Sequence, residues 1–190
     1  MQESPRRTQR ERSDAMRTAL IRAGRDLFVR LGFASTGTPD IVAAAGVTRG
    51  ALYHHFVDKE ALFAAVVRAE AEAVAAEIEA ADYVGLEPVD ALIRGGQAYL
   101  AAMAVPGRAR LMLVEAPAIL SPHVLMEIDL GTGGRTLETA LQAAGTVDPR
   151  PMASLLSAAF DRAALAIERG ERQEPWVGAL ERLVRGAVST

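Results

Sequence analysis

The feature that most constrains the fold is a pair of short amphipathic segments joined by a glycine-containing turn. Both lie within residues 31–62, which read LGFASTGTPDIVAAAGVTRGALYHHFVDKEAL. The turn is Ala45-Gly46-Val47, and apolar residues at helical spacing on either side predict two short helices. Such a pair forms a helix-turn-helix, whose second helix enters the major groove of DNA. The apolar residues that we expect these helices to bury are Ile41, Ala44, Val47, Leu52 and Phe56.

Charge is distributed unevenly along the 190 residues, in a way that fits this interpretation. Residues 1–60 contain 10 lysine and arginine residues against 7 aspartate and glutamate residues, a balance of +3. Residues 61–190 contain 11 against 17, a balance of −6, so the whole chain carries −3. Binding to DNA phosphates needs positive charge at the contact surface. The basic amino-terminal part meets that need, whereas the acidic remainder cannot form the DNA face.

Composition narrows the fold class and excludes several kinds of site. Half of the residues are hydrophobic, only 5% are aromatic, and no clean alternating segment occurs, so an all-α fold is favoured. The absence of cysteine excludes disulfides and thiolate metal sites, and three histidines make a poor metal set. No apolar run approaches the roughly 20 residues that span a bilayer, and the polar amino terminus is unlike a signal peptide. We therefore expect a cytoplasmic protein with no metal and no cofactor.

Residues that favour the start or the end of a helix divide the chain into helical segments. Ser13 and Asp14 can start a first helix that Gly32 ends. Thr38 can cap a second helix whose first position is Pro39. A cap at Asp58 and later proline and glycine signals predict helices near 59–80, 88–104, 107–116, 122–143, 149–169 and 175–187, with interruptions at Pro117 and at Gly131-Thr132-Gly133-Gly134.

Three regions follow from these signals. Residues 1–12 are expected to form a flexible basic tail, residues 13–57 the helix-turn-helix domain, and residues 58–190 a larger helical domain. The tail is rich in arginine and has no apolar cluster, so it is either a solvated segment or a flexible arm that reaches DNA. Its arginines are Arg6, Arg7, Arg10 and Arg12.

The second short helix carries polar side chains that suit DNA contacts. Arg49 opens this helix, and a guanidinium there can bind O6 and N7 of guanine. Tyr53 lies one turn later on the same face, and Thr48 can cap the helix and contact phosphate. Lys59 begins the next helix, where its charge and free backbone N–H groups would hold a phosphate. The alternative is a helical corner whose polar side chains only face water. The other polar residues here are His54 and His55.

The residues that define this region occur in a specific order: Leu27-Phe28, Gly32-Phe33, Thr36, Asp40-Ile41, Ala45-Gly46-Val47, Gly50, Leu52-Tyr53, His55-Phe56, Lys59-Glu60 and Leu62. This pattern, over residues 15–64, resembles the tetracycline-repressor-like (TetR/AcrR) family of bacterial transcription regulators. The resemblance implies three DNA-binding helices, a connecting helix, and a larger domain for ligand binding and dimerisation. Pro39 departs from the family pattern, because proline offers no polar base contact. By position, the family's DNA contacts fall on Thr38, Thr48, Arg49, Gly50, Tyr53, His54, His55 and Lys59.

Two sets of residues in the larger domain are candidates for the functions that the resemblance implies. Apolar stripes on the last two long helices suit pairing across a two-fold axis, although packing within one chain is the alternative. The dimer candidates are Leu155, Leu156, Phe160, Trp176, Leu180 and Leu183. A ligand pocket is expected between residues 88 and 169, although its candidates also fit an ordinary core. The pocket candidates are Tyr99, Met103, Met112, His123, Met126 and Arg135.

These expectations together predict a homodimeric transcription regulator. It would act as a repressor and leave a palindromic operator when a small, partly apolar ligand binds. One alternative is a DNA-coating protein without an effector, and another is a small-molecule enzyme. No Ser/His/Asp arrangement, glycine-rich phosphate loop or carboxylate pair at a plausible site supports an enzyme. The carboxylates that we interpret as a solvated helix face are Glu70, Glu72, Glu77 and Glu79.

Overall fold

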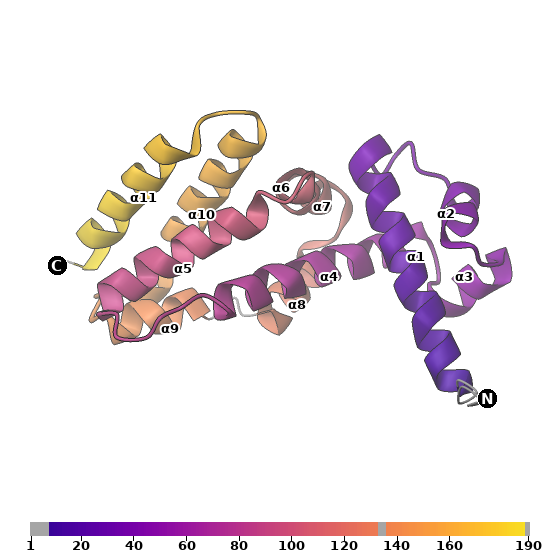
Figure 1. Cartoon of the computed structure of the whole chain (residues 1–190), viewed down its shortest axis with the longest axis horizontal. Coiled ribbons are helices and arrows are strands. Elements are labelled where there is room, and N and C mark those ends of the chain that lie inside the picture. Colours follow the sequence, from indigo (N-terminus) through magenta and orange to yellow (C-terminus); the bar gives the residue numbers. More distant parts are fainter. Residues whose placement is uncertain (1–7, 133–135, 189–190) are drawn as a thin grey trace, which may run out of the picture. The chain divides into compact units, whose positions relative to one another are not determined.

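The computed structural model describes residues 8–132 and 136–188, and every regular element in these ranges is helical (Figure 1). The predicted all-α class is confirmed. No helix in these ranges is long and apolar enough to cross a lipid bilayer. The helices are α1 (Gln9–Leu31), α2 (Thr38–Ala45), α3 (Arg49–His55), α4 (Lys59–Glu79), α5 (Pro88–Met103), α6 (Arg108–Arg110), the π-helix η1 (Leu111–Glu115), α7 (Ala116–Ile119), α8 (Pro122–Gly131), α9 (Thr136–Ala143), α10 (Pro149–Glu168) and α11 (Gln173–Val188).

The chain divides into two compact units between Val66 and Val67, within α4. We call residues up to Val66 the amino-terminal unit and the rest the carboxy-terminal unit. The expected functional boundary between residues 57 and 58 lies just before α4 and stays a prediction.

Helix α1 begins earlier than the sequence suggested. The Thr8 hydroxyl oxygen accepts a hydrogen bond of 3.3 Å from the Glu11 N–H, and the Glu11 carboxylate accepts one of 2.7 Å from the Thr8 N–H. This reciprocal capping box satisfies two N–H groups that a helix start leaves open. The helix therefore starts at Gln9 rather than near Ser13. The expectation of a flexible tail is corrected for residues 8–12, which belong to the capped first turn.

Two local features fix the turn between α2 and α3. The α2 cap is Gly37 rather than the expected Thr38, because the Asp40 carboxylate accepts a hydrogen bond of 3.3 Å from the Gly37 N–H. At the other end Gly46 has φ 65°, a left-handed conformation that glycine adopts without steric cost. The N–H of Val47 then donates to the Val42 carbonyl, which ends α2 and turns the chain toward α3.

The amino-terminal unit has its own apolar core. Phe63 meets two other rings, with centroids 5.1 Å from Phe28 and 5.0 Å from Phe33, both in edge-to-face geometry. Leu52 is the buried residue of α3, so this short helix has one face in the core and the other free. The remaining buried apolar side chains include Leu20, Leu27, Ile41, Phe56, Leu62 and Val66.

The carboxy-terminal unit has a second core, built mainly from α5, α10 and α11. Gly96 of α5 faces Phe160 of α10, and a Cβ atom at position 96 would collide with that ring. Glycine is therefore what allows these two helices to approach so closely. Buried side chains of this core include Leu92, Leu100, Met103, Leu141, Leu156, Leu180 and Val184.

The expected interruption at Pro117 takes a different form. The helical backbone continues to Ile119, and a π turn over Leu111–Glu115 precedes the proline. The N–H of Ala116 donates to the Leu111 carbonyl, five residues earlier, as in a π-helix. Proline disturbs the regular pattern of hydrogen bonds four residues apart, so a wider turn ahead of it lets the helix continue. The predicted break after Gly131 is confirmed, since α8 ends at that residue.

Candidate DNA-binding surface

Helix α3 presents its polar residues from a firmly capped start. The Thr48 hydroxyl oxygen accepts a hydrogen bond of 3.2 Å from the Ala51 N–H, which confirms the predicted cap. Arg49 follows directly and is exposed, while Tyr53 on the next turn is 43% exposed. Leu52 between them is fully buried. One side of α3 thus anchors the helix while the other carries the side chains expected to contact DNA.

Three of the predicted contact residues come together at one corner. The Arg49 guanidinium lies 5.5 Å from the centroid of the Tyr53 ring, a cation–π distance. Hydrogen bonding from the Thr38 side chain, and next from Arg49, lowers the pKa of the Tyr53 phenol. Thr38 opens α2 and the other two belong to α3, so both short helices contribute to this corner. The side chains are held in place by one another while remaining exposed or partly exposed.

The two histidines at the end of α3 differ in environment. Their rings meet edge to face with centroids 5.2 Å apart. His54 is exposed, whereas Nε2 of His55 is buried and has no hydrogen-bond partner among the residues that the structure describes. Loss of solvent, and then the nearby His54 and Arg17, lowers the pKa of His55. The proposed DNA contact of His55 therefore concerns a side chain that faces partly into the unit.

Lys59 has partners that its position in the sequence did not indicate. Its ammonium group donates hydrogen bonds of 2.8 Å to the Phe33 carbonyl and 3.0 Å to the Thr36 carbonyl. It also lies 4.2 Å from the centroid of the Phe33 ring. These contacts tie the start of α4 to the segment between α1 and α2. An ammonium has three N–H groups, so one remains for the phosphate that we predicted there.

The arginines of the expected tail fall into two groups. Arg10 and Arg12 are exposed residues of α1, not of a flexible arm. Arg6 and Arg7 lie outside the described residues. A further arginine, Arg17, lies with its guanidinium carbon 5.4 Å from the centroid of the Phe56 ring, at the end of α3. Arg17 was not among the residues predicted to contact DNA. For Arg10 and Arg12 a signal was present, because the capping-box spacing of Thr8 and Glu11 extends α1 toward the amino terminus.

The predicted pocket residues are scattered in the carboxy-terminal unit. Met103 belongs to the core, Met112 is partly buried against it, and Arg135 lies outside the described residues. His123 and Met126 are on the exposed side of α8, where Met126 is 53% exposed. Tyr99 is mostly buried and donates a hydrogen bond of 2.5 Å to Asp161 of α10. Burial, followed by the Asp161 charge, raises the pKa of Tyr99, and burial also raises that of Asp161.

The predicted dimer residues divide between core and surface. Leu156, Phe160 and Leu180 are buried within the chain's own core. Leu155 of α10 is 67% exposed and Leu183 of α11 is 47% exposed, so these two are available for contact with another chain. Trp176 is partly exposed. It donates a hydrogen bond of 3.1 Å to Glu171, and Arg162 lies 5.9 Å from its ring centroid.

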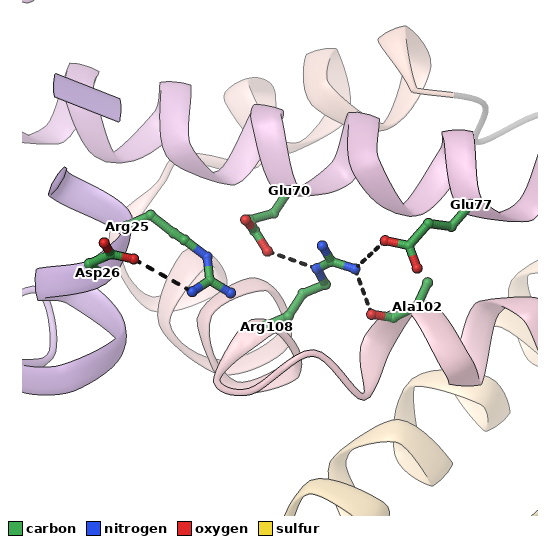
Figure 2. A network of polar contacts seen from close by, with 6 residues as sticks. All are labelled: Arg25, Asp26, Glu70, Glu77, Ala102 and Arg108. Atoms are coloured by element: carbon green, nitrogen blue, oxygen red, sulfur yellow. Dashed lines mark hydrogen bonds and ion pairs between the residues drawn. The ribbon is translucent and has the colours of Figure 1, made fainter. Parts of the chain in front are cut away.

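An ion-pair network around buried Arg108 in the carboxy-terminal unit corrects the interpretation of Glu70 and gives the exposed Glu77 a partner (Figure 2). Arg108 Nε lies 2.7 Å from Glu70, and its Nη1 lies 2.9 Å from Glu77 and 2.6 Å from the Ala102 carbonyl oxygen. The relative exposure of Arg108 is 6%, and that of Glu70 is 9%. Glu70 is therefore not part of a solvated helix face. It lies seven residues before Glu77, a spacing that puts both on one side of α4.

Sequence models of two domains match this chain. The model of the bacterial regulatory proteins, tetR family, matches residues 20–66, which contain α2, α3 and about half of α1. A tetracyclin repressor-like C-terminal domain model matches residues 89–187, more than half of the chain. The two matches cover the helix-turn-helix and the helical core described above.

Individual relatives support the same assignment. The HTH-type transcriptional regulator UidR of Escherichia coli K12 is 38% identical over 56 residues, which are 30% of this chain and 29% of that protein. The chain thus matches less than a third of that relative's length. The A-factor receptor protein of Streptomyces griseus is 26% identical over 172 residues, 83% of this chain and 60% of that protein.

Solved structures extend the likeness to nearly the whole chain. A TetR-family transcriptional regulator from Pectobacterium atrosepticum is 31% identical, with a TM-score of 0.72 over 97% of this chain and 99% of that one. A transcription regulator from Shewanella sp. PV-4, 24% identical, shares the fold with a TM-score of 0.75 over 90% of this chain and 97% of that one. The chain therefore belongs to the tetR family of bacterial regulatory proteins and is a DNA-binding transcriptional regulator, not an enzyme.

Proposed function

We propose that this regulator represses transcription as a homodimer that inserts two copies of α3 into a palindromic operator. The observation that carries the proposal is the exposed pair Arg49 and Tyr53 beside Thr38. A guanidinium at this position can bind a guanine edge, while the phenol and hydroxyl contact the DNA backbone. In a two-fold dimer the α3 helices would be separated by one helical turn of DNA, roughly 34–36 Å. The side chains and backbone that we propose for DNA contact are Thr38, Thr48, Arg49, Gly50, Tyr53, His54, His55 and Lys59.

The proposed dimer would form through α10 and α11. Leu155 and Leu183 are large apolar side chains that these helices leave exposed. Contact between two copies would remove them from water, and a two-fold axis would match the symmetry of a palindrome. Their exposure supports α10 and α11 as the dimer face.

We further propose that a small, partly apolar ligand releases the dimer from DNA. The name of one relative, the A-factor receptor protein, supports a receptor role, and that of another, a transcriptional repressor of Mycobacterium tuberculosis, supports repression. Within this chain, the Tyr99–Asp161 hydrogen bond supplies polar groups beside the Phe160 ring, whose centroid is 6.1 Å from that of Tyr99. A ligand can act only by binding the released conformer better than the DNA-bound one.

The decisive experiment is a selection from random duplex oligonucleotides, followed by footprinting. We expect a discrete palindrome, and a promoter carrying it should be less active when the protein is present. Uniform coverage of DNA would instead support the coating protein, and higher promoter activity would make this regulator an activator. Protein that selects no sequence would overturn the proposal. Candidate ligands are then tested for release of the labelled operator.

A further inference from the structure

The carboxyl end of helix α3 has no lysine or arginine of its own that could meet a DNA phosphate. After Arg49 the helix contains no lysine or arginine, and its last turn carries His54 and His55. The carboxyl end of a helix bears a partial negative charge, which disfavours a phosphate unless a cation offsets it. Burial lowers the pKa of His55, so this ring is mainly neutral near pH 7. Two of the three N–H groups of the Lys59 ammonium are used by backbone carbonyls.

Arg17 of α1 lies at this end of α3. Its guanidinium carbon is 5.4 Å from the centroid of Phe56, the residue that caps the carboxyl end of α3. It is also close enough to His55 to affect the charge state of that ring. Arg17 is exposed and forms no ion pair or hydrogen bond within residues 8–132 and 136–188. Its positive charge is therefore free, while the aromatic ring restrains the side chain.

Arg10 extends the same face of α1. It lies seven residues before Arg17, which on a helix is two turns and about 10 Å along the axis. The capping box at Thr8 and Glu11 makes this part of the chain helical, so the relative position of the two arginines is fixed. Arg10 is exposed and, in the part of the chain that the structure describes, also forms no ion pair or hydrogen bond. In Figure 1 the amino-terminal turns of α1 extend below α3 in the view drawn.

We propose that Arg10 and Arg17 form a phosphate-binding strip on α1, which continues the DNA-binding surface past the carboxyl end of α3. Successive phosphates of one strand are about 3.4 Å apart along the helix axis, so a 10 Å strip spans about three of them. The partner is the sugar–phosphate backbone beside the bases that α3 reads. Restraint by Phe56 lowers the entropy that Arg17 loses on binding, which favours a persistent contact. This inference rests on the proposed role of α3 in DNA binding.

The test compares three single variants, Arg10→Gln, Arg17→Gln and Arg22→Gln, in the full-length protein. Arg22 is an exposed residue of the same helix, and it lines a groove together with Ala44 and Ala45 of α2. It is therefore a control with the same change in charge. Binding to the selected operator and to a random duplex is measured at several salt concentrations. Each neutralised phosphate contributes about 0.9 to the slope of log affinity against log salt.

For Arg10→Gln and Arg17→Gln we expect the slope to fall by about 1.8 each, because each subunit of the dimer loses one phosphate contact worth about 0.9, with affinity lost equally for operator and random DNA. Arg22→Gln should keep the wild-type slope. Arg17→Lys, which keeps the charge, should retain most of the slope. Thermal melting of all variants shows whether a loss of binding comes from a loss of folding. Arg10 makes no polar contact within the described residues, so its variant tests the strip without disturbing the fold.

Two results would overturn the inference in different ways. If wild-type protein selects an operator but both variants keep its slope, the strip does not contact phosphate, and the proposed role of α3 stands. If wild-type protein prefers no duplex, the proposed function fails and the strip fails with it.

Discussion

Arg108 and Glu70 are 38 residues apart in sequence and form a buried ion pair in which Nε and a carboxylate oxygen lie 2.7 Å apart. Removing Glu70 leaves the buried Arg108 guanidinium with only the half-exposed Glu77 carboxylate to balance its charge. Glu70→Ala should therefore lower the free energy of unfolding by about 3–5 kcal/mol, as measured by urea denaturation. Glu72→Ala, on the exposed side of the same helix, is the control and should change stability little. Similar stability of the two variants would contradict the importance of the pair.

Lys59 is expected to stabilise the amino-terminal unit whether or not it also contacts DNA. Lys59→Met removes the hydrogen bonds to the Phe33 and Thr36 carbonyls. We expect a loss of about 1–3 kcal/mol in the free energy of unfolding, because the carbonyls lose their partner. Lys59→Met with wild-type melting behaviour would refute this role. A salt slope reduced by about 1.8, which is about 0.9 for each subunit of the dimer, would in addition support a phosphate contact.

Arg49 is expected to determine specificity. Arg49→Ala should reduce discrimination at one base pair of each half-site by about 1–3 kcal/mol. The measurement is a set of operators with single substitutions, each titrated with wild-type and variant protein. Equal weakening on every sequence, the operator and random DNA included, would mean that Arg49 contacts only the backbone.

The dimer face is testable because its candidates differ in burial. Leu155→Glu combined with Leu183→Glu should give folded monomers in sedimentation, since both side chains are exposed within one chain. Phe160→Glu should instead unfold the chain, because this ring lies in the core against Gly96. Folded dimers of the double variant would place the interface elsewhere.

His55 should make stability depend on pH. Its pKa in the folded protein is lowered, chiefly by loss of solvent, so the unfolded chain binds the proton more tightly. The contribution of His55 is complete above its unfolded pKa, about 6.5, and is lost as the pH falls below that value toward the folded pKa. The melting temperature should therefore decrease in this range. The melting temperature of the His55→Phe variant should decrease less steeply over the same range. An identical pH profile for variant and wild type would show that His55 is not responsible.

The sequence was sufficient for features that depend on neighbouring residues. The cap at Thr48, the turn at Gly46 and the end of α1 at Gly32 are local, and all three were predicted. The cap of α2 was assigned one residue too late, because the Asp40 carboxylate accepts a hydrogen bond from the Gly37 N–H.

Features that depend on residues far apart in the chain could not be predicted from the sequence. The Phe33 carbonyl that receives the Lys59 ammonium is 26 residues away, and a loop carbonyl leaves no mark in the sequence. In the sequence Glu70 is indistinguishable from its exposed neighbours, and only the contact between α4 and Arg108 shows that it is buried. Similarly, Leu155 and Leu156 are both apolar, and only the packing of α10 separates the exposed side chain from the buried one.

The close approach of α5 and α10 has a consequence for how this chain can vary. The Phe160 ring occupies the space in which any side chain at position 96 would begin. Substitutions at these two positions are therefore interdependent: alanine at 96 becomes acceptable only when a smaller residue replaces the ring. A library that randomises both codons together should yield folded members with one bulky partner, on either helix, and none with two.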